Sequence, residues 1–208
     1  MFTSFESHFQ PDSFSGGRQT SESITSAGDA DLVRFLSQFG GMSFNNGLYR
    51  VTDHGITLSA RSFIEAAFPT YASRAQPFAY DWLGRIFALD SNRFEGNLRA
   101  VTMFEPGTSE ALELPCNLVT FHESELIDYP EAALAVSFYQ LWLASGGGVP
   151  ALDQCIGYKK PLFIGGKDKV TNLEISNLDV YWSLSGQLVR RMRDLSPGAT
   201  NRNIVSRS

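Results

Sequence analysis

The sequence predicts an α+β fold: an antiparallel sheet meander with flanking helices, arranged as two closely packed halves. Short apolar segments separated by tight-turn signals run through the first half of the chain, as in a meander. Other segments carry apolar residues at helical spacing. The chain has 208 residues, of which 43% are hydrophobic and 19% charged. It can therefore build a sizeable core and falls outside the disordered class.

The first 28 residues are rich in Ser, Thr and Gly, which predicts a loosely ordered N-terminal arm. Three phenylalanines, Phe2, Phe5 and Phe9, nevertheless follow the spacing of one helix face before Pro11. Exposed phenylalanines reduce solubility, so we expect a short helix that docks these rings on the body of the protein.

A helix, a broken strand and a second helix are expected next. The first helix covers about 31–39, with Asp29 as its N-cap and an apolar stripe on one face. Residues 44–51 form a strand broken at Asn46-Gly47, a hairpin or bulge signal, and the second helix covers 59–68. The stripe of the first helix is Leu32, Phe35, Leu36 and Phe39.

Two strand pairs complete the predicted meander. In residues 77–90, Phe78, Tyr80 and Trp82 alternate toward one face before a turn at Leu83-Gly84. Strands over 100–104 and 111–114 are joined through Pro106-Gly107, which predicts a type II turn with a positive φ at the glycine.

The second half is predicted to be more helical. A helix over 131–144 ends at three glycines, and a strand over 155–164 is interrupted by Pro161. Another short strand is expected around Val180 and Trp182. The last helix, 183–195, is expected to bury Leu184, Leu188, Met192 and Leu195. The tail, 196–208, is polar and expected to fray.

Charge is distributed in blocks along the chain. The net charge is −2 over residues 1–99, −8 over 100–158 and +5 over 159–208. All four lysines lie between Lys159 and Lys169. Such blocks commonly form surface patches of one sign. The alternative is that the acidic run folds beside arginines from elsewhere and is neutralised.

Catalytic motifs are incomplete. His122-Glu123 begins a zinc-protease pattern, but position 126 is leucine. Gly165-Gly166-Lys167 resembles the end of a phosphate-binding loop but lacks its first glycine and the final Ser or Thr. We therefore expect no catalytic residues, no metal site and no cofactor. The rival hypothesis is a small-molecule-binding or enzymatic domain, with a pocket near Asp81, Trp82 and His122.

Composition also limits compartment and partners. The acidic net charge of −5 argues against direct nucleic-acid binding, and no apolar run reaches the length of a membrane helix. The first ten residues lack the features of a signal peptide. The two cysteines, Cys116 and Cys155, stand in apolar contexts that suit core positions. We therefore expect a cytoplasmic protein that does not bind membranes.

Two parts of the sequence resemble known families. Residues 77–90, followed by 104–108, resemble the GAD-like domain at the N-terminus of certain bacterial proteins. Residues 155–168 (CIGYKKPLFIGGKD), with 172–174, 179–182 and 186–188, are similar to the C-terminal domain of Tdi-type type VI secretion immunity proteins. This resemblance divides the chain into an arm (1–28), a GAD-like part (29–115), an immunity domain (116–195) and a tail (196–208).

The resemblance implies an inhibitor, not an enzyme, which binds and silences a cognate DNase effector in the cytoplasm. Since a nuclease presents a basic surface to DNA, we expect acidic residues to occlude its active or DNA-binding site. An adaptor that loads the effector for secretion is a third hypothesis. The expected partner-binding residues are Glu105, Glu110, Glu113, Glu123, Glu125, Asp128, Tyr158 and Lys159.

Overall fold

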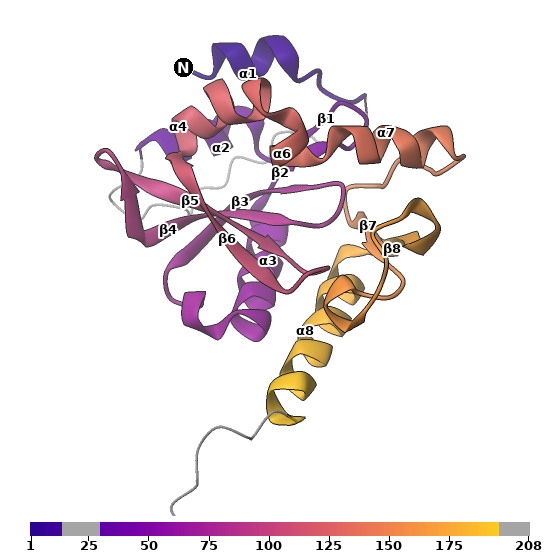
Figure 1. The fold of residues 1–208 in the computed structure, drawn as a ribbon. Coiled ribbons are helices and arrows are strands. Elements are labelled where there is room, and N and C mark those ends of the chain that lie inside the picture. Colours follow the sequence, from indigo (N-terminus) through magenta and orange to yellow (C-terminus); the bar gives the residue numbers. More distant parts are fainter. Residues whose placement is uncertain (14–29, 196–208) are drawn as a thin grey trace, which may run out of the picture.

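The computed structural model describes residues 1–13 and 30–195, which form three layers around a six-stranded antiparallel sheet (Figure 1). Each strand of the large sheet pairs with its neighbour in sequence, so the sheet is a meander. A separate two-stranded sheet packs beside it. The predicted α+β class is confirmed. The expectations for the Asp29 cap, for residues 14–28 and for the tail lie outside the described residues.

Hairpins connect the strands of the large sheet. The Asn46-Gly47 signal is confirmed, because β1 and β2 form a hairpin with positive φ at Asn45, Asn46 and Gly47. The strands are β1 (Ser43–Phe44), β2 (Tyr49–Val51), β3 (Ala75–Asp81), β4 (Ile86–Glu95), β5 (Leu98–Glu105) and β6 (Glu110–Asn117).

A β-bulge in β3 corrects the predicted alternation of its aromatic side chains. Pro77 pairs with Ala88 and Ala79 with Phe87, so Phe78 is an extra residue in the strand. A bulge of this kind places two consecutive side chains near the same face. Phe78 and Ala79 accordingly join one buried cluster, while Tyr80 joins the other.

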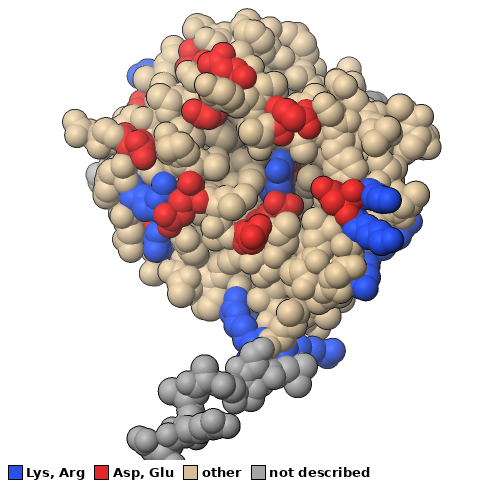
Figure 2. Space-filling model, viewed as in Figure 1, with Lys and Arg blue, Asp and Glu red and all other residues tan. Residues whose placement is uncertain are grey.

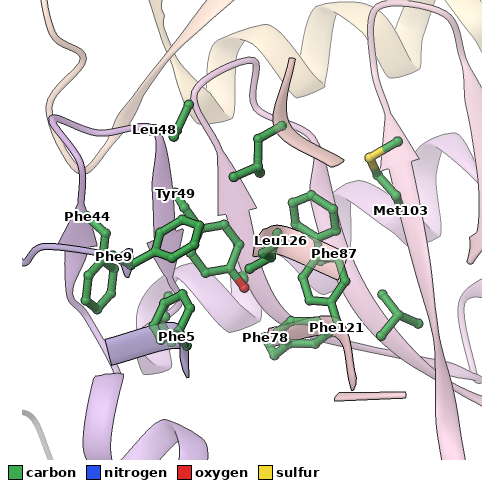
Figure 3. Packing of buried hydrophobic residues seen from close by; sticks show 14 of the residues in the cluster. Phe5, Phe9, Phe44, Leu48, Tyr49, Phe78, Phe87, Met103, Phe121 and Leu126 are labelled. Carbon is green, nitrogen blue, oxygen red and sulfur yellow. The ribbon is translucent and has the colours of Figure 1, made fainter. Parts of the chain in front are cut away.

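The first helical layer covers one face of the sheet. Its main cluster is built from aromatic and aliphatic side chains of these helices and of the strands below (Figure 3). The layer contains α1 (Thr3–His8), α2 (Ala30–Phe39), α4 (Leu118–Thr120), the π-helical turn η2 (Phe121–Glu125), α5 (Leu126–Asp128), α6 (Pro130–Leu134) and α7 (Val136–Ala144).

The N-terminal phenylalanines belong to this cluster, as expected. Phe2 and Phe5 are fully buried, and Phe9 stacks on Phe5 with ring centroids 4.6 Å apart. The stripe predicted for α2 is buried as well. By contrast, the single helix expected over 131–144 is broken at Ala135, which has a φ of 49°. Leu141, which follows this break, is 56% exposed.

The second helical layer covers the other face with α3 (His54–Ala67), the short helix η1 (Pro69–Tyr71) and part of α8 (Leu178–Leu195). Asp53 caps α3 by accepting a hydrogen bond from the Ile56 amide at 2.8 Å, so the helix begins earlier than predicted. Phe63 of α3 stacks on Trp182 of α8, with ring centroids 5.7 Å apart.

The C-terminal part adds the hairpin of β7 (Gln154–Tyr158) and β8 (Leu173–Asn177), with the short helices η3 (Leu162–Ile164) and η4 (Val170–Asn172) between them. The strand predicted around Val180 and Trp182 is wrong, because both residues lie in α8. Burial of Leu184 and Met192 is also wrong, since they are 55% and 43% exposed. The helix instead buries Tyr181, Trp182, Ser185 and Val189.

Candidate partner-binding surface

The two halves of the molecule meet at the β5–β6 turn. The Gly107 carbonyl oxygen accepts hydrogen bonds from the backbone amides of Leu162 at 2.8 Å and Phe163 at 3.3 Å. A Cβ atom on Gly107 would lie 2.7 Å from the Tyr158 ring, so only glycine allows this approach. The predicted type II turn is wrong, because the positive φ falls on Ser109 and not on Gly107. The glycine is needed for close packing instead.

Two glutamates of this turn face each other. Glu105 and Glu110 are register partners on β5 and β6. Like charges directly opposite each other destabilise a strand pair. Burial raises the pKa of Glu105; the charge of Arg85 opposes this, and the charges of Asp81, Glu110 and Asp168 raise the pKa further. Carboxylates thus crowd one another where the halves meet.

Tyr158 fixes the third carboxylate of this group. Its hydroxyl donates to Asp168 Oδ1 at 2.7 Å, and the Tyr158 side chain is buried. Asp168 itself is exposed. Tyr158 therefore positions an acidic group from inside the protein and is not itself available to a partner. Lys159 is exposed and donates to the Thr171 carbonyl at 3.3 Å.

A buried ion pair lies beneath the turn. Arg85 Nε donates to Asp81 Oδ2 at 2.6 Å, and Arg85 also donates to the Ala133 carbonyl oxygen at 3.0 Å. Both side chains of the ion pair are buried. Because Arg85 is committed to Asp81, it offsets the charge of Glu105 only in part. We name the three residues Glu105, Glu110 and Asp168 the acidic junction.

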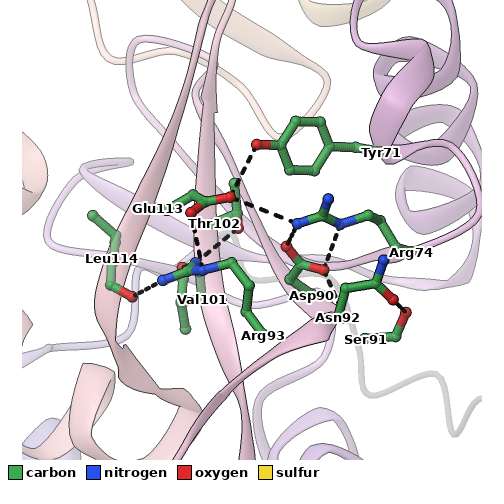
Figure 4. Close-up of polar contacts among 10 residues, drawn as sticks. All are labelled: Tyr71, Arg74, Asp90, Ser91, Asn92, Arg93, Val101, Thr102, Glu113 and Leu114. Atoms are coloured by element: carbon green, nitrogen blue, oxygen red, sulfur yellow. Dashed lines mark hydrogen bonds and ion pairs between the residues drawn. The ribbon is translucent and has the colours of Figure 1, made fainter.

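Glu113 has a different environment on the same strand. Its carboxylate lies 3.2 Å from Arg93 Nε and 3.6 Å from an Arg74 nitrogen, and it accepts a hydrogen bond from Tyr71 (Figure 4). Arg74 also pairs with Asp90. Arginines from β4 and from the segment before β3 thus neutralise Glu113, so it does not fit the predicted role of an available contact.

The remaining predicted acids are divided between internal and exposed positions. Glu123 accepts hydrogen bonds from the Ser4 amide at 3.2 Å and the Ser4 hydroxyl at 3.1 Å, so it holds the start of α1. Glu125 is partly exposed, and Asp128 is exposed. Figure 2 shows acidic side chains in separate places, with basic side chains among them and at the lower right. On this face the acidic run does not form one continuous patch.

The rival pocket near Asp81, Trp82 and His122 is not supported, because all three side chains are fully buried. His122 Nε2 lies 2.8 Å from the Tyr49 hydroxyl, and Nδ1 lies 2.8 Å from the Leu118 carbonyl oxygen. Burial lowers the pKa of His122 to about 3, against a weaker opposing effect of the Leu118 hydrogen bond. This imidazole is a neutral, enclosed core group.

The described part of the chain lacks a metal-binding cluster and a membrane-spanning helix. Across residues 1–13 and 30–195, no three His, Cys, Asp or Glu side chains are arranged to hold a metal ion. Among the helices of these same residues, none is both long and apolar enough to span a membrane. Burial raises the pKa of the Cys116 and Cys155 thiols to about 12 each, as befits core cysteines.

A family model matches a large part of the C-terminal half of the chain. Residues 128–189 match the family model described as "T6SS immunity protein Tdi1, C-terminal". This part of the chain is therefore similar to the C-terminal domain of Tdi1, an immunity protein of the type VI secretion system. The match includes α6, α7, the β7–β8 hairpin and the first part of α8, and it includes Asp168 of the acidic junction. The division of the chain at residue 116 stays a prediction.

A solved structure shares the fold of this protein. The crystal structure of Atu4351 from Agrobacterium tumefaciens superimposes with a TM-score of 0.55 at 16% sequence identity. The alignment covers 90% of this chain and 89% of that chain, so the likeness extends over both halves. A search of curated proteins gives no match.

Sequence reasoning missed the contribution of two residues to this surface. Asp168 belongs to the segment that resembles the immunity family, but nothing in its spacing indicates that Tyr158 holds it. Arg85 follows a tight turn, and only the folded sheet shows that it lies near Glu105. A search for cations within a few residues of each strand turn would have drawn attention to Arg85, but not to its partner.

Proposed function

We propose that this protein is an immunity protein that binds a cognate DNase effector and neutralises it by occluding its active or DNA-binding site, with the acidic junction as the main contact. The family of residues 128–189 supports an effector as the partner. The observation that carries the choice of surface is the register of Glu105 against Glu110, which places like charges opposite each other beside Asp168.

The acidic junction holds charge that the protein itself does not neutralise. Among the described residues, no ion pair forms at Glu105, Glu110 or Asp168, whereas Glu113 has two. A basic side chain from a partner would relieve the repulsion between Glu105 and Glu110. A nuclease carries such side chains where it binds DNA phosphates, so the same surface of the effector would be covered.

The site of action in this proposal is the bacterial cytoplasm. Cys116 and Cys155 are both free and buried, which agrees with a reducing compartment. Glu125 on η2, Asp128 on α5 and Lys159 are the further residues of the proposed contact.

The experiment is co-expression of this protein with a candidate nuclease encoded beside its gene, followed by measurement of cell survival and of DNA cleavage by the purified pair. The double variant E105K/E110K should lower the association rate by about 10–10³-fold at low salt and abolish protection. The matched control is E65K, since Glu65 is an exposed acid on α3, away from β5 and β6.

Three outcomes separate the hypotheses. Loss of protection in E105K/E110K, but not in E65K, supports the proposal. Unchanged protection and unchanged association kinetics would overturn the acidic junction as the contact. Binding that leaves DNA cleavage unaffected would overturn neutralisation and favour the adaptor that loads the effector.

A further inference from the structure

The last helix carries an apolar ridge that faces solvent. Val180 is 50% exposed, Leu184 55% and Met192 43%, and Leu188 is partly exposed. These four residues follow one another at intervals of four and form a single ridge along the helix surface. We name them the α8 ridge.

The packing of α8 on the rest of the protein does not use this ridge. A different set of residues, Tyr181, Trp182, Ser185 and Val189, is buried. Trp182 Nε1 donates to the Gly84 carbonyl oxygen at 2.8 Å, which fixes the rotation of α8 about its axis. Figure 1 shows the C-terminal half of α8 extending beyond the sheet. The helix is therefore apolar on two faces, of which one is covered by described residues.

A groove runs beside the ridge. A cavity of about 220 Å³ lies between α8 and the β7–β8 hairpin, and Leu184 and Leu188 form part of its wall with Tyr158 and Tyr181. Ridge and groove thus lie side by side on one surface. In a two-fold symmetric dimer the same surface of both copies is in contact. A surface with a ridge and a groove side by side can therefore pack against a second copy of itself.

The ridge and its flanking charges are also self-complementary. The midpoint between Val180 and Met192, and between Leu184 and Leu188, is position 186. The acidic residue Asp179 lies beside Val180 at the start of the ridge, and the basic residue Arg191 lies beside Met192 at its end; both are on the same flank, because each precedes its ridge residue by one position. When two copies of α8 pack in antiparallel orientation, the acidic end of each meets the basic end of the other.

We propose that the α8 ridge binds a second copy of this chain, with a two-fold axis that crosses the ridge between Leu184 and Leu188 and with the two helices antiparallel. Leu184 of each copy then packs on Leu188 of the other. The end of α8 is basic, which disfavours the basic surface of a nuclease at this place. This surface is independent of the acidic junction, and its failure would leave the proposed neutralisation of an effector untouched.

The first test measures the mass of the full-length protein by sedimentation velocity over a range of concentrations. We expect a concentration-dependent dimer. L184D should weaken it by about a hundredfold or more, because the two-fold axis introduces each substitution twice at the centre of the interface. The matched control is L141D, since Leu141 is 56% exposed on α7 and belongs to no described core cluster. It should leave the dimer unchanged.

The second test uses charge reversal and does not depend on the stability of any one variant. D179K and R191E should each be monomeric at concentrations where the wild type is dimeric. Mixed in equal amounts, they should form a heterodimer, since opposite charges then meet at both ends. A wild type that is monomeric throughout, or variants that do not pair when mixed, would overturn the proposal. The proposal would also be overturned if the amides of the α8 ridge were protected from hydrogen exchange only when a nuclease effector is bound.

Discussion

Two positions on strand β6, Glu110 at its start and Glu113 in its middle, show how one residue type acquires two different environments. The carboxylate of Glu113 is surrounded by Arg74, Arg93 and the Tyr71 hydroxyl. At Glu110, the register partner is another glutamate, Glu105. Counting acids in the sequence treats these positions as equal. Among the described residues, Glu113 forms two ion pairs and Glu110 forms none, and the repulsion between Glu110 and Glu105 has a cost in stability.

The largest expected effect comes from removing Arg85, the cation of the buried ion pair beneath the acidic junction. R85M should lower the free energy of unfolding by about 3–5 kcal/mol, because Asp81 stays fully buried without its partner. Urea denaturation measures this. The double variant D81N/R85M should recover part of the loss. A loss below about 1 kcal/mol in R85M would show that the ion pair is not what supports this end of the strand.

The group of charges around Glu113 should lose stability when Asp90, its buried carboxylate, is removed. Burial tends to raise the pKa of Asp90, but hydrogen bonds from Arg74 and the Asn92 amide, with the charges of Arg74 and Arg93, lower it overall. D90N should therefore cost about 1.5–3 kcal/mol at neutral pH.

The pH dependence of this loss has a definite sign. A lowered pKa in the folded state stabilises the protein above the ordinary carboxyl pKa, and this stabilisation disappears as the pH falls through the folded-state value. The difference in unfolding free energy between wild type and D90N should accordingly shrink under acidic conditions. A difference that does not change with pH would contradict this explanation.

Removing a charge from the acidic junction should raise stability, whereas removing the charge of Asp90 should lower it. The pKa of Glu105 is raised, so its charged form is disfavoured in the folded state. E105Q should raise the free energy of unfolding at neutral pH, by up to about 1 kcal/mol. The gain should fade as the pH falls through the raised pKa, since the wild-type side chain is then protonated as well. Thermal unfolding at several pH values checks this, and a loss of stability in E105Q at neutral pH would argue against repulsion at the junction.

The smallest effect is expected at Glu113, which serves as the control for E105Q. E113Q removes partly exposed ion pairs, so it should cost no more than about 1 kcal/mol and should not alter effector binding. Chemical denaturation and binding kinetics measured on the same sample test both parts. If E113Q weakened effector binding as much as E105Q, the contrast between Glu113 and the acidic junction would not hold.

Local patterns predicted much of the fold. The stripe of α2, the hairpin at Asn46-Gly47 and the docking of Phe2, Phe5 and Phe9 all depend on spacing within a few residues, and all are confirmed. The errors arise where distant packing decides. The β3 bulge separates Phe78 from Tyr80, and the tryptophan of α8 rotates that helix so that Leu184 faces solvent.

The candidate site was harder to predict than the fold. Sequence reasoning expected Glu105, Glu110, Glu113 and Glu123 alike to contact a partner, and it could not show which of them form ion pairs or hydrogen bonds within the protein. Tyr158 acts from inside the protein on Asp168. Glu123 instead holds the N-terminal helix, 119 residues away in sequence. Such long-range pairs leave no periodic signal in a single sequence.

The sequence by itself determined the α+β class, the apolar faces of most elements and the block of acidic residues along the chain, because these depend on residue type and short spacing. The tertiary structure alone decided which acids keep their charge and which face of α8 is left open. A hydrogen bond or an ion pair depends on distance in space, and the strand register and the rotation of one buried tryptophan set those distances.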